Sequence, residues 1–306
     1  MKRKVIEQGN GTLTITLPKK WTEKQSLKGG DEIDVSVEGP TMIVKAEGEI
    51  PAKSISISLD EKQYSPVASH PNMIRTIVGN MYKKGYDEIE IRFAEPKMIK
   101  YVQERANMLM GMEIIRSYEK SCVIKQLLKE DPAEFDSMLR KFFLMVLDYS
   151  KELYENKVQQ ENIDNFRLSI EKLNDFLERL IAKNLSQNAS DLRQLSIITR
   201  TIEKTTREYI HLSNYMIDND VKLSKTTKDL LKEANEMFRT FYEHYYKFDL
   251  ADSYKQANKK NKLLHLKGAE SLMNAPKKEI PVVHHLLNII RRIWDMEGPL
   301  ISLRLG

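Results

Sequence analysis

Polar and apolar residues alternate at the start of the chain. In residues 12–17 the sequence TLTITL changes character at every step, which is the period of a half-buried β-strand. Gly9, Asn10 and Gly11 predict a tight turn before this strand, and Pro18 has the backbone geometry that opens a short helix. Three further features are predicted in this segment: the end of that helix at Gly29 and Gly30, a strand at residues 33–37 and a strand at residues 42–46.

Residues 1–47 therefore form a small module of short strands. A segment of this length with such short strands buries little apolar surface when it folds alone. We expect it to pair with a second copy of itself, which makes the protein a homodimer.

The second segment, residues 50–130, contains both helical and strand patterns. Its predicted order is strand, helix, strand, helix, strand, strand, which is typical of a small α+β sandwich. The sequence here has no glycine-rich phosphate loop and no cluster of acid, base and nucleophile, so we interpret the segment as a scaffold or a dimer contact. The predicted strands lie at residues 55–59, 89–93, 113–117 and 121–127, and the helices open at Pro71 and Pro96.

From Asp131 onward the pattern is helical. Asp131 can cap a helix, Pro132 suits its first turn, and Glu134 stands where a capping box has its acid. Six apolar stripes follow at three- and four-residue spacing, so we expect six amphipathic helices that pack on one another. The stripes run from Phe135 to Leu153, Ile163 to Leu180, Leu192 to Leu212, Leu230 to Phe248, Tyr254 to Leu272, and Val283 to Trp294, the last stopped by Gly298 and Pro299.

The helical segment contains a short internal repeat. Arg200 is followed three residues later by Glu203, and Arg292 is followed in the same way by Asp295, at an offset of 92 residues. An offset of this size suits a duplicated unit of three helices. The alternative is two ordinary surface ion pairs, each worth roughly a few tenths of a kcal/mol.

Composition limits the class of protein. Of the 306 residues, 41% are hydrophobic and 30% are charged, which excludes a mainly disordered chain. The sequence has neither an apolar run long enough for a bilayer helix nor the pattern of a secretory signal, so we expect a cytoplasmic protein without membrane insertion. Cys122 is the single cysteine, which excludes an internal disulfide, and we expect it to be an inert strand residue.

Charge is unevenly distributed along the chain. The net charge is +5, yet the first thirty residues alone carry seven lysines and arginines against Glu7 and Glu23. Residues 31–47 have the opposite balance, with one lysine against five carboxylates. Such a split is typical either of an ordinary solvated surface or of a face that binds phosphates.

Candidate catalytic residues are scattered. No serine or cysteine has a base and an orienting acid near it in sequence, and the histidines lack metal-binding spacing, so we expect a protein that is not an enzyme. The six histidines are His70, His211, His244, His265, His284 and His285.

Two parts of the chain resemble known families. The strings GNGTLTITLPKKW, SLKGGDEIDVSV and TMIVKA are similar to the swapped-hairpin DNA-binding domain of the AbrB and SpoVT type, and the helical remainder resembles PhoU, the phosphate-uptake regulator. Hairpin, α+β insert and helices in this order resemble an archaeal family of phosphate-uptake regulators over nearly the entire chain. The resemblance implies an α+β multidomain protein: a swapped-hairpin β-barrel at residues 1–47, an α+β middle domain at residues 50–130, and a six-helix PhoU-like bundle of two three-helix repeats at residues 131–306.

The resemblance to AbrB-like domains implies a dimeric barrel whose basic face binds DNA. Thr12 follows Gly11 where many family members carry Arg or Lys, so we expect phosphate contacts more than base readout. The alternative is a hairpin used only for dimerisation or as an antitoxin-like binding module. The implied phosphate contacts, doubled by the dimer, are Lys2, Arg3, Lys4, Lys19, Lys20 and Lys24.

PhoU-like proteins carry acidic motifs, one set per three-helix unit, that bind iron, zinc or other metal ions. The resemblance places the first set at Glu161, Asp164 and Glu203. In the second unit the run 260–262, KNK, replaces the acids and leaves Asp295 nearly alone, and lysines repel cations. The resemblance therefore implies one metal site at most, and we expect no other cofactor.

Taken together, these features favour a cytoplasmic, homodimeric, DNA-binding transcriptional regulator linked to phosphate uptake. In this hypothesis the helical part senses or transmits the signal, which requires two global states. One alternative is a signalling adaptor whose helices bind a phosphate transporter ATPase or a histidine kinase and whose hairpin only dimerises. A second alternative is a metal-binding helical bundle.

Overall fold

The computed structural model describes residues 2–9, 11–46, 52–59, 70–183 and 188–305. The chain forms two compact units, Met1–Lys53 and Ser54–Gly306. The α+β segment and the helical segment, which the sequence predicts as separate domains, thus belong to one unit.

The N-terminal unit consists of two separate antiparallel strand pairs and one short helix. Gly9 and Gly11 have φ values of 32° and 78°, and the strands on either side of them pair, so the predicted turn is confirmed except at Asn10, which lies outside the described residues. The described strands of one chain form no closed barrel, because each sheet has two strands only; the predicted barrel needs strands from two chains. The pairs are β1 (Val5–Gln8) with β2 (Thr12–Ile15), and β3 (Ile33–Glu38) with β4 (Thr41–Ala46).

The short helix of this unit ends earlier than predicted. Helix α1 (Lys19–Lys24) stops well before Gly29. Ser26 adopts a left-handed φ of 56°, and the Leu27 N–H donates to the Thr22 carbonyl at 2.9 Å. This hydrogen bond closes the helix in the way that usually involves a glycine, so the expectation that a glycine would end the helix was wrong.

The second unit begins with a four-stranded sheet in the order β5-β6-β8-β7. Strands β5 and β6 are parallel and joined through α3, whereas the other neighbours are antiparallel. Buried residues alternate along β6 with residues that are partly or fully exposed, so one face of the sheet packs into the core with α3 and α4. The elements are β5 (Ser54–Leu59), α3 (Pro71–Lys83), β6 (Glu88–Phe93), α4 (Ile99–Ala106), β7 (Met112–Tyr118) and β8 (Ser121–Gln126), in the predicted order.

The single cysteine lies in this core. Cys122 is fully buried in β8, in agreement with the prediction of a strand residue. Burial raises the pKa of its thiol to about 12, which keeps the thiol protonated and unreactive at neutral pH.

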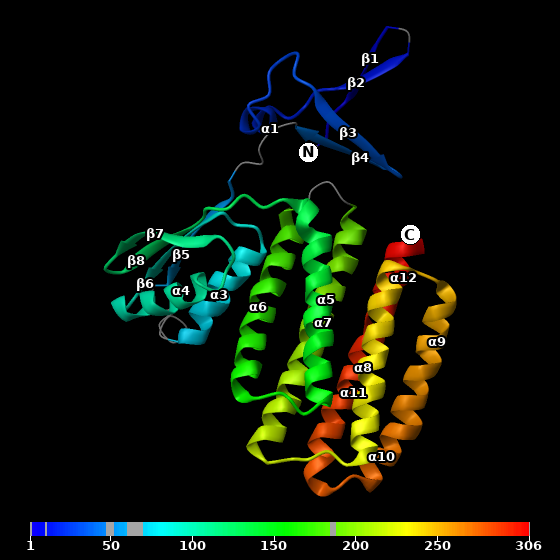
Figure 1. Ribbon diagram of the computed structural model, residues 1–306. Helices are drawn as coiled ribbons and strands as arrows, with labels where there is room; N and C mark the ends of the chain where they lie inside the picture. Colours follow the sequence, from blue (N-terminus) through cyan, green and yellow to red (C-terminus); the bar gives the residue numbers. More distant parts are fainter. Residues whose placement is uncertain (1, 10, 47–51, 60–69, 184–187, 306) are drawn as a thin grey trace. The chain divides into compact units, whose positions relative to one another are not determined.

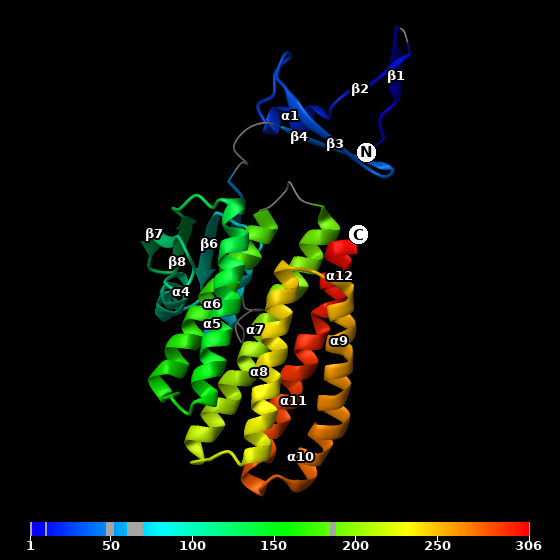
Figure 2. The same cartoon turned by 45° about the vertical axis from the view of Figure 1, so that its right-hand side comes forward.

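The rest of the unit is helical. Asp131 Oδ1 accepts a hydrogen bond from the Ala133 N–H at 2.9 Å, so the predicted cap is confirmed. Figures 1 and 2 show α5, α6, α7, α8 and α11 side by side, and α7 packs against both α6 and α11. Within the described part of the chain, no helix is long and apolar enough to cross a bilayer. The helices are α5 (Phe135–Tyr154), α6 (Gln160–Lys183), α7 (Ala189–Asp218), α8 (Lys225–Tyr246), α9 (Leu250–Asn261), α10 (Gly268–Asn274), α11 (Ile280–Asp295) and α12 (Glu297–Leu305).

The fifth predicted helix differs most from its sequence pattern. A π-helical segment, Lys262–Lys267, separates α9 from α10 and shifts the faces of the helix around its axis. Tyr254, which opens the predicted apolar stripe, is 70% exposed. The face that enters the core instead carries Ser253 and Gln256, and the Gln256 amide donates to the Met237 carbonyl at 3.1 Å.

The predicted stop at Gly298 and Pro299 is also wrong. Only Met296 separates α11 from α12, and both residues lie in the first turn of α12. Because the first N–H groups of a helix have no partner within it, the missing N–H of a proline costs little there.

Candidate functional site

Five of the six predicted DNA-binding residues are described with their side chains, and all five are exposed on the N-terminal unit. Lys2, Arg3 and Lys4 precede β1, and Lys19 and Lys20 open α1. The Lys24 side chain lies outside the described part of the structure. Lys19 is 3.7 Å from a carboxylate oxygen of Glu23, but both side chains are largely exposed, so this pair contributes little. Among the described residues the other four have no ion pair, which leaves their charges available to a polyanion.

Apolar side chains on the strands of this unit are exposed as well. None of its residues whose burial is described is buried, and the buried core of the chain begins only at Leu59. Leu13 in β2 is 67% exposed and Val37 in β3 is 73% exposed. The described strands of this unit therefore present apolar side chains to the solvent without a buried core of their own. The exposed apolar residues of the unit are Val5, Ile6, Leu13, Ile15, Val35, Val37 and Met42.

The three carboxylates of the predicted metal site do not meet. Glu161 and Asp164 lie in the first turns of α6, where the Gln160 amide contacts the Asn214 side chain of α7 at 3.3 Å. Glu203 is eleven residues from Asn214, which corresponds to about 16 Å along a helix. Within the described residues, no three His, Cys, Asp or Glu side chains are grouped so that they can hold a metal ion.

Two of these carboxylates have basic partners. Asp164 lies 3.4 Å from the Arg167 guanidinium, and Glu203 accepts a hydrogen bond from Arg207 one turn later. Arg200 pairs with Glu178 of α6, not with Glu203. The spacing shared by Arg200 and Arg292 therefore reflects contacts between helices, not intrahelical surface pairs.

Arg292 is part of a second polar cluster, on α7 and α11. Glu208 of α7 accepts from Arg292 at 2.7 Å and lies 2.8 Å from Nδ1 of His285. Burial raises the pKa of Glu208, but the hydrogen bonds from His285 and Arg292 outweigh burial and hold it below its usual value. The carboxylate is therefore ionised and joins the two central helices.

The most extensive polar network joins α6 to the sheet, and sequence patterns did not reveal it. Arg179 of α6 is fully buried, and its guanidinium donates to the Asp87 carboxylate at 2.6 Å and to the Tyr86 carbonyl at 2.7 Å. It also forms an ion pair with Glu130 and lies over the Tyr82 ring at 4.8 Å. A buried arginine with this many partners fixes the sheet against the bundle.

One turn earlier on α6, Asp175 makes a second contact between the helical bundle and the α+β segment. We call the contacts around Asp175 and Arg179 the joint. Its buried carboxylate pairs with Arg105 of α4 and lies 3.7 Å from Nζ of Lys83 on α3. Burial raises the pKa of Asp175, and the two cations oppose this effect. Since Asp175 and Arg179 are four residues apart, the sequence alone favours an intrahelical surface pair, whereas each residue contacts the sheet side instead.

A charged cleft of about 970 Å³ lies along the joint, lined from α3, α4, α6 and α7. Most of its cations are already matched: Arg75 pairs with Glu104, Arg105 with Asp175, and Arg200 with Glu178. The cleft is therefore neutralised largely from within, and its residues serve first to hold the two parts of the unit together.

A buried histidine and glutamate form a third polar pair. His244 of α8 and Glu297 of α12 are both almost inaccessible, with Nδ1 and Oε2 separated by 3.5 Å. Glu297 Oε2 accepts from the Ser253 hydroxyl at 3.0 Å, and the His244 ring stacks on Phe248. Neither ring nitrogen has a hydrogen-bond partner among the described residues, so this pair is incompletely satisfied.

Comparisons of the chain with family models, with curated proteins and with solved structures found no match. The geometry of the two units is therefore the basis on which a function is assigned.

Proposed function

We propose that the chain is a homodimeric DNA-binding transcriptional regulator whose helical unit receives the signal. The observation that carries this proposal is the N-terminal unit, in which apolar strand faces and unpaired basic side chains are exposed together. Exposure of the apolar faces to water is unfavourable, and the basic side chains can bind a polyanion.

A second copy of the chain is the partner that completes the strands. Each chain supplies two strand pairs without a core, and two such modules together offer eight strands to one barrel. The resemblance to swapped-hairpin domains describes this arrangement. Closure by a second copy also covers the unpaired edges of the strands, which otherwise favour aggregation.

The basic residues give this dimer its ligand. Lys2, Arg3, Lys4, Lys19 and Lys20 double to ten cations in a dimer, before Lys24 is counted. Contacts between these side chains and DNA phosphates supply affinity but little specificity for the base sequence. Residues 31–47 of the same module carry five carboxylates, which repel the phosphates of DNA. DNA must therefore bind to the face that carries the basic residues and not to the rest of the module.

The helical unit would act on DNA binding through its own ligand or protein partner. The link to phosphate homeostasis rests on the resemblance to PhoU, and it suggests a phosphate transporter ATPase or a histidine kinase as the partner. In this proposal the protein is cytoplasmic and has no catalytic role.

The proposal is tested with the full chain and a fluorescent DNA duplex at two salt concentrations. We expect tight binding that weakens steeply with salt, with a slope of about 0.9 per phosphate contact on a log–log plot. Changing Lys19 and Lys20 to glutamate should abolish it, whereas changing Lys232 and Lys255, exposed lysines of the helical unit, should not. A dimer that fails to bind DNA at low salt contradicts the regulator and supports the adaptor.

A further inference from the structure

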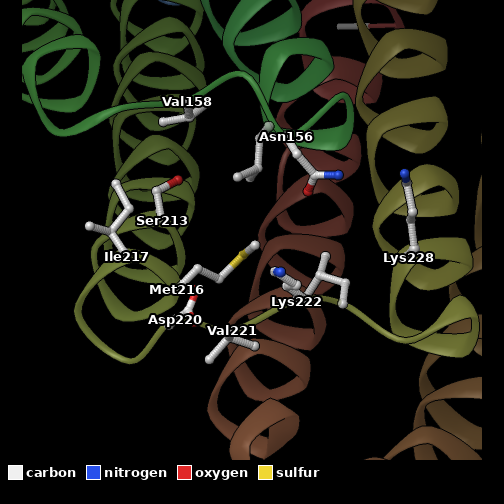
Figure 3. Close-up of a pocket in the computed structure, with 11 residues that line it drawn as sticks. Asn156, Val158, Ser213, Met216, Ile217, Asp220, Val221, Lys222 and Lys228 are labelled. Atoms are coloured by element: carbon white, nitrogen blue, oxygen red, sulfur yellow. The ribbon is translucent and has the colours of Figure 1, made fainter.

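A pocket of about 550 Å³ lies at the end of the helical bundle where α5 and α7 finish and α8 begins. This volume is in the range of small-molecule sites. Figure 3 shows its lining, which comes from the chain after α5, the last turns of α7 and the start of α8. The apolar part of the lining is Leu153, Val158, Met216, Ile217, Val221 and Leu223.

The rim of the pocket is built by two unusual helix ends. Asn156 and Asp220, which follow α5 and α7, have left-handed φ values of 56° and 46°. Each helix closes with a reverse hydrogen bond, from the N–H of Val221 to the Met216 carbonyl at 2.9 Å in the case of α7. Because glycine is usual at such positions, the side chains here add polar groups to the rim. In Figure 3 the Asn156 amide points towards the helix that carries Lys228.

The floor of the pocket is polar but fully satisfied. Ser213 is buried, accepts a hydrogen bond from the Tyr149 hydroxyl at 2.8 Å and donates to the Tyr209 carbonyl at 2.8 Å. Ser213 is therefore neither a nucleophile nor an open binding group. Specific contacts to a ligand must come from the rim.

The rim carries ammonium groups without carboxylate partners. Lys222 and Lys228 line the pocket, and Lys225 lies between them in sequence at the first position of α8. Among the described residues, none of the three has a carboxylate within ion-pair distance. The Lys228 ammonium lies over the Tyr154 ring, 4.8 Å from its centroid. The positive end of the helix dipole lies at the start of α8, so the dipole adds to the positive potential of these lysines and does not offset it.

Two carboxylates, Glu279 and Asp220, also bear on the charge of this rim. Glu279 accepts from the N–H and the hydroxyl of Ser224, whose own side chain caps α8 by accepting from the Thr227 N–H. Asp220 lines the pocket and reduces its charge without neutralising both lysines. The anion-binding groups are therefore the lysines and not the free N–H groups of the helix.

We propose that this pocket binds a small organic anion with an apolar body. The anionic group would lie between Lys222 and Lys228, and the apolar body would contact Leu153 and Met216. A hydrophobic pocket with few converging polar groups is the usual form of such a site. This site is separate from the DNA-binding proposal and does not depend on it, because every residue involved belongs to the helical unit.

Octanoate is a suitable probe, measured by isothermal titration calorimetry with the full chain. We expect saturable binding of one octanoate per chain, and none of octylammonium, which has the same apolar body and the opposite charge. Changing Lys222 or Lys228 to methionine should weaken binding about tenfold each, since a charge-assisted contact is lost. Asp220→Asn should tighten it, because the change removes the opposing charge.

Lys232→Met is the matched control, since Lys232 is an exposed lysine of α8 that pairs with Glu236. It should leave octanoate binding unchanged, and circular dichroism should show that all variants are folded. Octylammonium binding as tight as octanoate, unaltered affinity in the Lys222 and Lys228 variants, or no binding at millimolar octanoate would each overturn the proposal. DNA binding is measured separately, so a failure of one proposal leaves the other intact.

Discussion

The guanidinium of Arg105 occupies the space that a side chain at Gly79 would need. A Cβ built on Gly79 would lie 2.5 Å from Nη2 of Arg105 and 2.8 Å from its Nε. Gly79 lies inside α3, where glycine costs about 1 kcal/mol relative to alanine. The close approach gives this glycine a physical reason, because it lets Arg105 reach Asp175 across the joint.

Gly79→Ala should therefore have an effect whose sign depends on Arg105. In the natural chain we expect a loss of about 1–2 kcal/mol in the free energy of unfolding, because the new methyl displaces Arg105 from Asp175. In an Arg105→Ala background the same change should stabilise by about 1 kcal/mol through helix propensity. Urea unfolding of the four proteins in this double-mutant cycle measures both values. Additive effects would show that Gly79 and Arg105 are not coupled.

Arg179 should be the most sensitive charged residue of the joint. Arg179→Met leaves Glu130 without the guanidinium with which it forms an ion pair, and it removes one of the cations around Asp87, inside a buried site. We expect a loss of about 3–5 kcal/mol, as is typical when one partner of a buried ion pair is removed. Arg167→Met, which removes an exposed pair with Asp164, is the control and should cost less than about 1 kcal/mol. Thermal unfolding followed by circular dichroism compares the two, and equal losses would contradict the role assigned to Arg179.

The pair of His244 and Glu297 predicts a dependence of stability on pH. Burial raises the pKa of Glu297, against the opposing effects of Ser253 and His244. A carboxyl whose pKa is higher in the folded state holds its proton more tightly there. Its contribution thus favours folding below the ordinary glutamate pKa and is lost as the pH rises through the folded value.

Glu297→Gln should remove this dependence while keeping an acceptor for Ser253. Relative to the natural chain, the variant should gain stability as the pH increases from about 4 towards neutrality. Urea unfolding at several pH values measures the difference, and Glu270→Gln, a change at an exposed residue, is the control. A difference between the natural chain and the Gln variant that stays constant with pH would contradict the assignment.

The sequence predicted those elements whose faces follow a simple period. The strands and helices of residues 54–126 and the stripes of α5 to α8 agree with the structure, because one side of each is apolar and buried. The fifth stripe failed because a π-helical segment shifts the register and the buried face carries Ser253 and Gln256. A prediction from helix periodicity assumes a constant number of residues per turn. It also assumes that the buried face is apolar, so it misses buried polar side chains that form hydrogen bonds with each other or with the backbone.

The candidate sites divide in the same way. The exposure of the basic N-terminal residues could be predicted from the sequence, because a charged side chain in water does not depend on a tertiary partner. The joint around Arg179 could not be found, because its partners Asp87 and Glu130 are separated from it by 92 and 49 residues. The resemblance to PhoU placed Glu161, Asp164 and Glu203 in one metal site, but the register of α6 and α7, in which Gln160 contacts Asn214, keeps Glu161 and Glu203 apart.

The exposed strand faces of the N-terminal unit predict that dimerisation and DNA binding are lost together. Val37→Lys places a charge on the apolar face of β3, where the natural side chain is 73% exposed in one chain and would be covered by a second copy. Desolvating that ammonium costs several kcal/mol, enough to separate the copies at micromolar concentration. Light scattering coupled to gel filtration should show a monomer, and DNA binding should weaken accordingly.

The helical unit has its own core, so its unfolding temperature should stay unchanged. Met273→Lys, at an even more exposed apolar residue of α10, is the matched control and should remain a dimer. A Val37→Lys protein that stays dimeric would place the dimer contact outside the strands and remove the physical basis for the proposed barrel.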